Sequence, residues 1–183
     1  MKHHLTILLV LLTMNYVDNS NLSIKISNKV LVKKPKENTV LIITDDLYDL
    51  KITIEKTKKE TYNLIVLVNL KKESYYVSPN TKRDFKGKFK MNLGSYKDLS
   101  FAGKILETPL SKEIIDTHPF INGSVNWVRV KTTYKQALNL KNKNDFEVFG
   151  KIKFIIEPQC SLEEIPFTIQ YKNGKMIFID SKC

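Results

Sequence analysis

The sequence predicts an all-β fold, mainly antiparallel, built as a β-sandwich or barrel with at most one or two short helices. Three observations lead to this fold class. Apolar and polar residues alternate with a period of two along several segments, short turn-forming stretches separate those segments, and an Asn-Gly pair joins the last two of them. Many strands joined by short turns are typical of sandwiches and barrels.

The first twenty residues have the pattern of a secretory signal peptide. Lys2 and two histidines precede an apolar run over residues 5–14. A run of this length suits a signal peptide and is well short of the roughly 20 residues that span a bilayer. No pair of small residues marks a cleavage site, which we place near Ser20. The alternative is an apolar first strand of a cytoplasmic domain.

We therefore expect a signal peptide over residues 1–20 and a single mainly β domain over residues 21–183. Such a protein would be secreted or periplasmic, and the mature chain would have no transmembrane span. Two glycosylation sequons, at Asn21 and Asn122, would matter only in a secreted eukaryotic protein.

Alternation predicts half-buried antiparallel strands, most clearly at residues 48–55, 85–93 and 146–156. The continuous apolar run over residues 64–68 suits a central strand covered on both faces. Shorter strand candidates are residues 22–26, 30–33, 40–44, 75–77 and 99–106.

The sequence near the end of the chain predicts a β-hairpin. Residues 167–172 and 175–180 flank Asn173 and Gly174. Asn-Gly between two strand-like runs favours a type I′ turn, because that turn needs positive φ at both central residues.

One short helix is expected after Thr108 and Pro109, which would supply its N-cap and first position. His118 would end it, because a residue that precedes proline avoids the helical region.

The chain carries 30 Lys and Arg against 19 Asp and Glu, a net charge of +11. Arginine occurs only at Arg83 and Arg129. Proteins that read nucleic acid rely on arginine for bidentate contacts, so a lysine excess indicates at most a general attraction to polyanions. The alternative is that the charge reflects composition alone.

Motifs for catalysis, metals and cofactors are absent from the sequence. Once a signal peptide is removed, His118 is the last histidine, and no Gly-x-Ser-x-Gly motif accompanies it. The acidic stretch Asp45–Asp49 lacks the glycine and distal glutamate of a calcium-binding loop and is typical of a capped turn. We expect no catalytic residue, no metal site and no cofactor.

Two cysteines, Cys160 and Cys183, bracket the expected hairpin. An even number of cysteines in an exported chain favours a disulfide, which here would add about 3 kcal/mol of stability. In a reducing compartment both would remain thiols.

A basic surface with one aromatic residue is the candidate binding site. On a predicted strand over residues 125–131, Trp127 shares a face with Arg129 and Lys131, and a second stripe of cations lies on the strand over residues 85–93. An exposed tryptophan flanked by cations can bind an anionic glycan, a lipid headgroup or a protein surface. The alternative is a buried Trp127. The candidate residues are Trp127, Arg129, Lys131, Lys86, Lys88 and Lys90.

The expected function is that of an exported, non-enzymatic binding or interaction protein with a basic surface. Two alternatives remain. A small-ligand carrier would hold its ligand in an apolar barrel pocket. A hydrolase that uses only carboxylates is less favoured, because the adjacent acidic pairs point apart on a strand. The pocket of the carrier would be lined by Phe85, Phe89, Met91, Phe154 and Phe178.

Overall fold

The computed structural model of the chain describes residues 30–31, 39–57, 61–119 and 121–179. Every regular element in these ranges is a strand. The all-β antiparallel prediction is confirmed. The expected signal peptide, Asn21, the strand over residues 22–26 and Cys183 lie outside the described residues.

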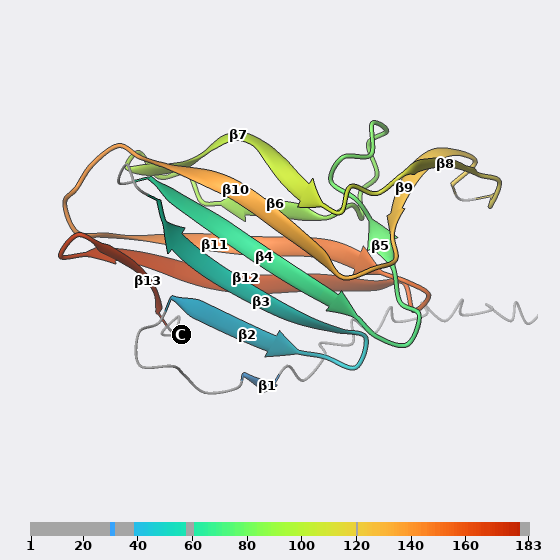
Figure 1. Cartoon of the computed structure of the whole chain (residues 1–183), viewed down its shortest axis with the longest axis horizontal. Helices are drawn as coiled ribbons and strands as arrows, with labels where there is room; N and C mark the ends of the chain where they lie inside the picture. The colour runs from blue at the N-terminus through green and yellow to red at the C-terminus, as the bar shows by residue number, and fades with distance from the viewer. Residues whose placement is uncertain (1–29, 32–38, 58–60, 120, 180–183) are drawn as a thin grey trace, which may run out of the picture.

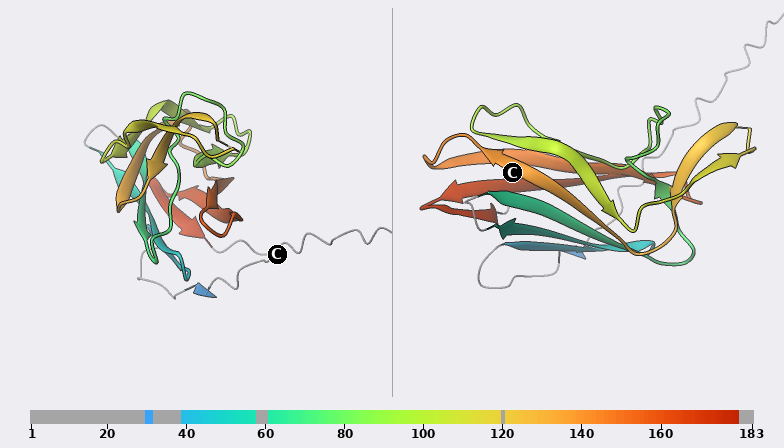
Figure 2. Two further views of the ribbon diagram at one scale, coloured as in Figure 1. Left: turned by 90° about the vertical axis from the view of Figure 1, so that its right-hand side faces the viewer. Right: turned by 45° about the horizontal axis from the view of Figure 1, so that its top comes forward.

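Within the described residues, thirteen strands form two stacked sheets and a small third sheet at one end (Figure 1). The larger sheet has the order β1-β2-β3-β4-β10-β7, the second sheet β13-β12-β11-β6 and the third β5-β9-β8. Figure 2 shows the two large sheets as separate layers, so the architecture is a sandwich. The strands are β1 Val30–Leu31, β2 Val40–Thr44, β3 Tyr48–Lys56, β4 Tyr62–Leu70, β5 Tyr76–Val77, β6 Lys90–Leu93, β7 Leu99–Thr108, β8 Glu113–Asp116, β9 Gly123–Val128, β10 Thr132–Leu140, β11 Phe146–Ile156, β12 Ser161–Lys172 and β13 Lys175–Ile179.

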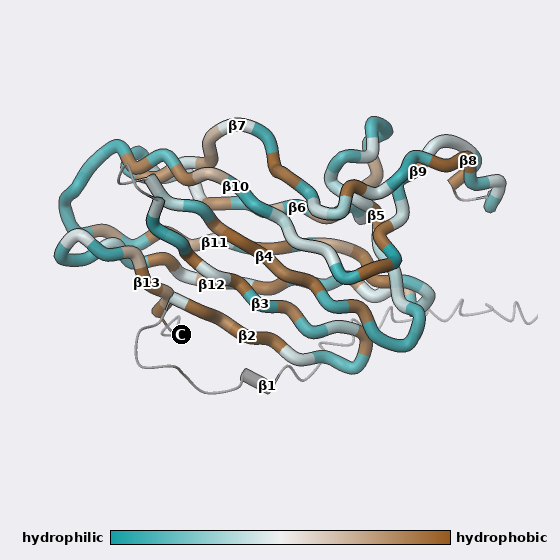
Figure 3. Tube along the Cα trace, viewed as in Figure 1, coloured by the Kyte–Doolittle hydropathy of each residue, from teal (hydrophilic) through white to brown (hydrophobic). Residues whose placement is uncertain are grey.

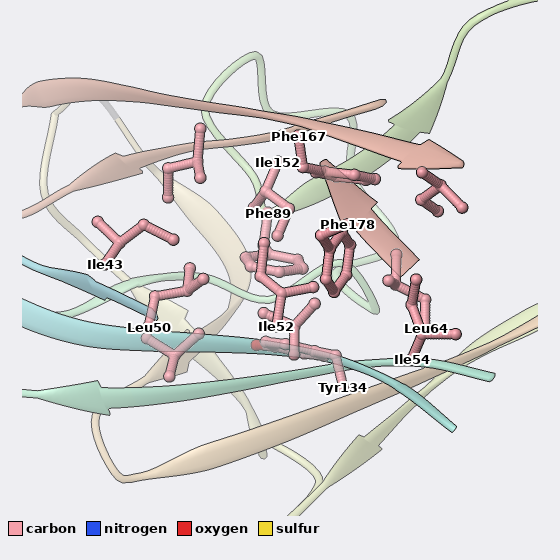
Figure 4. Close-up of a cluster of buried hydrophobic side chains, with 14 of the residues drawn as sticks. Ile43, Leu50, Ile52, Ile54, Leu64, Phe89, Tyr134, Ile152, Phe167 and Phe178 are labelled. Carbon is pink, nitrogen blue, oxygen red and sulfur yellow. The ribbon is translucent and has the colours of Figure 1, made fainter. Parts of the chain in front are cut away.

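The core lies between the two large sheets (Figure 4). Along β3 and β11 every second side chain is buried, which is the period expected of strands with one wet face. Apolar residues concentrate on the strands and polar residues on the loops between them (Figure 3). Each fully buried large apolar side chain contributes about 1.5–3 kcal/mol relative to an exposed one.

Aromatic rings fill the middle of the core. Phe89 stacks on Tyr134 with a centroid separation of 4.2 Å and lies 5.7 Å from the Phe154 ring. Phe154 also packs against Tyr76 at 5.2 Å. Phe89, Phe154 and Phe178, which the carrier interpretation placed around an open pocket, are therefore core residues that pack against other rings.

A buried hydrogen bond joins the two sheets near one end. The Tyr48 hydroxyl on β3 donates to the Glu163 carboxylate on β12 at 2.6 Å, and the Ser161 hydroxyl donates to the same carboxylate at 2.8 Å. Burial, and then this hydrogen bond, hold the pKa of the Tyr48 phenol far above its usual value. The neighbouring Glu164 points outward to Lys151, so the adjacent carboxylates lie on opposite faces, as predicted.

The C-terminal hairpin is confirmed. Lys172 pairs with Lys175, and φ is 50° at Asn173 and 76° at Gly174. Positive φ at both central residues is the signature of the expected type I′ turn.

The two strands of this hairpin differ in length, which bears on the expected disulfide. The last residue of β13, Ile179, pairs with Thr168, so residues 161–167 of β12 extend beyond β13. Cys160 precedes that stretch, which is roughly 23 Å long. The predicted partner, Cys183, lies outside the described residues.

The disulfide between Cys160 and Cys183 therefore stays a prediction. Intact mass with and without an alkylating reagent checks this. An oxidised monomer would support the disulfide, whereas two alkylated thiols per chain or a disulfide-linked dimer would contradict it.

The structure differs from two sequence-based predictions, one for residues 113–116 and one for residues 64–68. Residues 113–116 form β8 rather than a helix, because their main chain pairs with β9: Ile114 lies opposite Val125. The run over residues 64–68 is central in its sheet, but Ile65 and Leu67 are only half-buried, because nothing in the described structure covers the outer face of that sheet.

Candidate interaction surface at the arm

One excursion leaves the sandwich between two paired strands. β7 and β10 are neighbours, with Thr108 opposite Thr133. Between them the chain turns outward, forms the β8–β9 hairpin and returns. We call residues 109–131, apart from the undescribed residue 120, the arm. Figure 1 shows it projecting from one end of the molecule, next to β5, which pairs with β9.

A buried carboxylate anchors the root of the arm. Glu107, at the end of β7, is only 8% exposed. One of its oxygens accepts hydrogen bonds from the Ser78 hydroxyl at 2.5 Å and the Asn80 amide at 2.6 Å, and the other from the Ser111 hydroxyl at 2.5 Å. A carboxylate is tolerated at such depth when donors surround it. We call this set the Glu107 node, and it ties β7, the loop after β5 and the start of the arm together.

The loop after β5 runs along β9 and holds the arm from the side. Lys82 pairs with Glu113 of β8 at 3.1 Å, and the guanidinium of Arg83 donates to the carbonyl of Ile121. The Ser124 hydroxyl and then Lys82 keep the pKa of the Glu113 carboxyl below its usual value. The arm therefore makes specific polar contacts along its length.

Trp127 lies in a corner made of three segments. Its indole N–H donates to Asp116 of β8 at 2.9 Å, and its ring meets the edge of Tyr75 at 4.9 Å. The Arg129 guanidinium lies over the Tyr75 ring, 3.9 Å from the centroid, and 6.0 Å from that of Trp127. We call Tyr75, Asp116, Trp127 and Arg129 the aromatic corner.

The corner revises the predicted arrangement around Trp127. β9 ends at Val128, so Arg129 and Lys131 lie in the loop before β10 and not on one strand. Trp127 is half-buried, neither a core residue nor fully exposed. Val130, in the same loop, is exposed.

The predicted lysine stripe does not form. Only Lys90 of the three lies in a strand, and Lys86 sits exposed in the preceding turn. The Lys88 side chain is 19% exposed, and its ammonium lies 4.0 Å from the Asp84 carboxylate, which is also 3.9 Å from the ammonium of Lys90. Asp84 thus offsets part of the expected positive charge.

Exposed apolar side chains gather on the arm and at its root. Ile115 is 73% exposed, a large value for an isoleucine in a strand. The members of this apolar group are Leu106, Leu110, Ile114, Ile115 and Val130. They come from the end of β7, the following loop, β8 and the loop before β10, all in the half of the molecule that carries the arm (Figure 1).

Sequence reasoning missed Glu107, Tyr75 and Asp116. Glu107 ends a strand whose alternation put it on the inner face, opposite Tyr134, and an acidic residue at an inward position was the available signal. Tyr75 and Asp116 had no comparable signal, because their roles depend on contacts with Trp127 from distant segments.

The described residues open a pocket of about 310 Å³ at the end opposite the arm. Its lining consists of two lysines, two tyrosines, one leucine and one glycine, so none of the four phenylalanines or the methionine expected around a carrier pocket contributes to it. The lining residues are Lys56, Tyr62, Leu140, Lys143, Tyr171 and Gly174.

Within the described segments, His, Cys, Asp and Glu side chains form no group of three or more that could hold a metal ion. The described residues bury three carboxylates, those of Asp98, Glu107 and Glu163. Glu107 lies opposite Tyr134 and Glu163 accepts from Tyr48, and a chain of ring contacts through Tyr76 and Phe154 separates the two. No helix in the described ranges has the length and apolar character that a membrane crossing requires.

No protein-family model matches the sequence, and a search of curated proteins finds no match. Among solved structures, the GAE domain of GGA2p from Saccharomyces cerevisiae is similar at a TM-score of 0.38 and 10% identity, over 79% of this chain and 98% of that one. The yeast GGA1 GAE domain is similar at a TM-score of 0.37 and 7% identity, over 79% and 99%. Similarity at this level says nothing about partners or activity.

Proposed function

We propose that the chain is an exported, non-enzymatic interaction protein that binds a partner protein through the arm. The observation that carries the proposal is the gathering of exposed apolar side chains on the arm and its root. Burial of apolar surface drives most protein association, and apolar groups rimmed by polar residues mark interaction sites. Export rests on the signal-like run over residues 5–14.

A protein partner suits the arm better than a lipid or glycan surface. β8 carries Ile114 and Ile115 between two surface carboxylates, Glu113 and Asp116. Both carboxyls have lowered pKa values and are ionised at neutral pH. Lys82 already pairs with Glu113, so Asp116 is the carboxylate that would repel an anionic bilayer or a sulfated glycan. A polypeptide can place apolar and basic groups to match the arm.

Photo-crosslinking tests the proposal. A photoreactive benzoylphenylalanine at Ile115 should form an adduct with a discrete protein from the source organism. Ile114→Ser, which removes an apolar side chain from the opposite face of the same strand, should weaken the adduct without changing the circular dichroism spectrum. The matched control carries the probe at Glu55, an exposed position on β3, and should give no adduct.

Co-sedimentation with vesicles of neutral and of anionic lipid tests the competing hypothesis that the arm binds a membrane surface. Binding to anionic vesicles that depends on Ile114 and Ile115, with no protein adduct, would overturn the proposal. Equal adducts from Ile115 and Glu55 would also overturn it, because they would show no preference for the arm.

The cations near the arm would act mainly on association rate. Replacing Lys86, Lys88, Lys90 and Arg129 together should slow association with an acidic partner and reduce its salt dependence, with a smaller change in the dissociation rate. Asp84 already screens Lys88 and Lys90, so the effect should come mostly from Lys86 and Arg129. Stopped-flow kinetics at two salt concentrations measures this.

A further inference from the structure

Arg129 lies on the aromatic corner in a way that restricts its side chain. Its guanidinium covers the Tyr75 ring at 3.9 Å, and Trp127 lies at 6.0 Å. Stacking uses the flat face of the guanidinium and leaves the N–H donors in its plane available. A free arginine would lose rotamer entropy on binding a ligand, whereas a stacked arginine has already lost part of it.

The two rings beneath Arg129 are themselves held. Tyr75 exchanges two main-chain hydrogen bonds with Glu157, at 3.1 and 2.8 Å. Asp116 holds the Trp127 indole and also accepts the main-chain N–H of His118 at 2.9 Å. The His118 N–H and then the indole lower the pKa of the Asp116 carboxyl, so it remains a charged acceptor.

The donors of Arg129 face solvent. Arg129 is exposed, and among the described residues no carboxylate lies within the 4.0 Å that defines an ion pair with it. Its planar fork of donors matches the two oxygens of a carboxylate. Asp116 contributes a nearby negative charge but forms no ion pair with Arg129, so the corner is a preorganised cationic site whose planar donors are not used by a carboxylate of the described structure.

The surroundings favour a carboxylate that belongs to a polypeptide. The register places Ile114 opposite Val125, on the same face of the small sheet as Trp127. Ile114 is exposed, so an apolar side chain can pack beside the site. A polyphosphate or sulfated glycan has no apolar group to place there and would bring many charges close to Asp116.

Building on the proposed function of the arm, we propose that Arg129 captures a single acidic side chain of the partner polypeptide in a bidentate pair, while an apolar neighbour of that side chain packs against Ile114. The aromatic corner would thereby determine which partner sequences bind. The apolar group on the arm would supply contact area to any of them.

Trp127 offers a direct readout, because it is the one tryptophan in the 183-residue chain. The probe is a capped hexapeptide that alternates glutamate and leucine, so that its only carboxylates are side chains. The comparison peptide has glutamine at each glutamate position. The glutamate peptide should change Trp127 emission in a saturable way, and the glutamine peptide should bind at least about tenfold more weakly.

Arg129→Lys is the decisive variant, because it keeps the charge but loses both the fork and the stacked plane. We expect it to weaken binding of the glutamate peptide by about tenfold or more. The matched control is Lys51→Ala, which removes one exposed cation from the outer face of β3 and should leave affinity unchanged.

Three results would overturn the capture of a carboxylate. The first is wild-type affinity in Arg129→Lys. The second is a Trp127 signal that does not respond to millimolar glutamate peptide. The third is inorganic phosphate or a heparin oligosaccharide competing for the Trp127 site as effectively as the glutamate peptide does. Each of these would leave the crosslinking result at Ile115 untouched, so failure here is distinguishable from failure of the proposed function.

Discussion

The sandwich and the arm are held together by different interactions. Between the two large sheets the contacts are almost entirely apolar, and the aromatic rings around Phe89 and Phe154 leave little room for solvent. The arm buries few large apolar side chains, chiefly Val125 and Val128. Its position depends instead on the Glu107 node, on Lys82 and on the hydrogen bond between Trp127 and Asp116.

This contrast has a functional consequence. Burial is non-directional and stabilises whatever lies between the sheets, but it uses up apolar surface. Hydrogen bonds to buried acceptors fix a thin element in place while its apolar side chains remain exposed. The arm can therefore be rigid and still present Leu110, Ile114 and Ile115 to a partner.

The largest effect that can test this contrast is in the core. Phe154→Ala should lower the free energy of unfolding by about 3–5 kcal/mol, because it removes a buried ring and leaves a cavity. Val130→Ala on the arm should change it by about 0.5 kcal/mol or less, because Val130 is exposed. Urea unfolding measures both. Equal effects would mean that the two regions are not held differently.

A smaller, localised effect is expected at the root of the arm. Glu107→Ala leaves the donors of Ser78, Asn80 and Ser111 without their acceptor, at a cost of about 1–3 kcal/mol. Hydrogen exchange should speed up in β8 and β9 and remain slow in β3 and β4.

Glu107→Gln is the matched control for that variant. Its carbonyl oxygen still accepts one or two of the three donors, so the loss of protection in β8 and β9 should be smaller. If Glu107→Ala accelerated exchange equally in the arm and the sandwich, the node would be part of the core rather than an anchor for the arm.

The smallest effect concerns acid stability on the outer face of the second sheet. Lys151 and then Lys153 lower the pKa of the Glu164 carboxyl to about 2. A carboxyl with a lowered folded-state pKa stabilises the fold above its unfolded value of about 4.3, and the contribution is lost as pH falls toward about 2.

The urea midpoint should therefore fall less between pH 4.3 and 2 in Glu164→Gln than in the wild type. The difference at neutral pH should be slight, because exposed pairs are screened by solvent. High salt should reduce the difference further. A steeper acid limb in Glu164→Gln than in the wild type would contradict this account.

Much of the sandwich could be predicted because its signals are local. Alternation marked β3 and β11, and Asn173-Gly174 marked the hairpin turn, where the side chains and φ angles needed lie within a few residues. The acidic stretch after β2 is a capped turn as predicted, with the Leu47 N–H donating to Asp45 at 3.0 Å.

The arm was predicted poorly because its structure depends on distant partners. Thr108-Pro109 followed by Ile114 and Ile115 resembles a helix start, yet the pairing with β9 made a strand. The strand expected over residues 85–93 is shortened to Lys90–Leu93, because Phe89 turns into the core beside Val77, where its N–H is bonded.

By itself, the sequence determined that this chain folds as antiparallel sheets with one apolar face each, where its final hairpin turns, and that lysine dominates its charge. Only the tertiary structure decided which cations are neutralised and that Glu107 anchors the arm. It also decided that Arg129 lies on the Tyr75 ring and not in a row with the lysines. The reason is physical. Which side chains of a strand are buried follows from the alternation of residues along that strand. The partner of a charged group or an aromatic ring depends instead on the pairing of strands, which brings together segments separated by tens of residues.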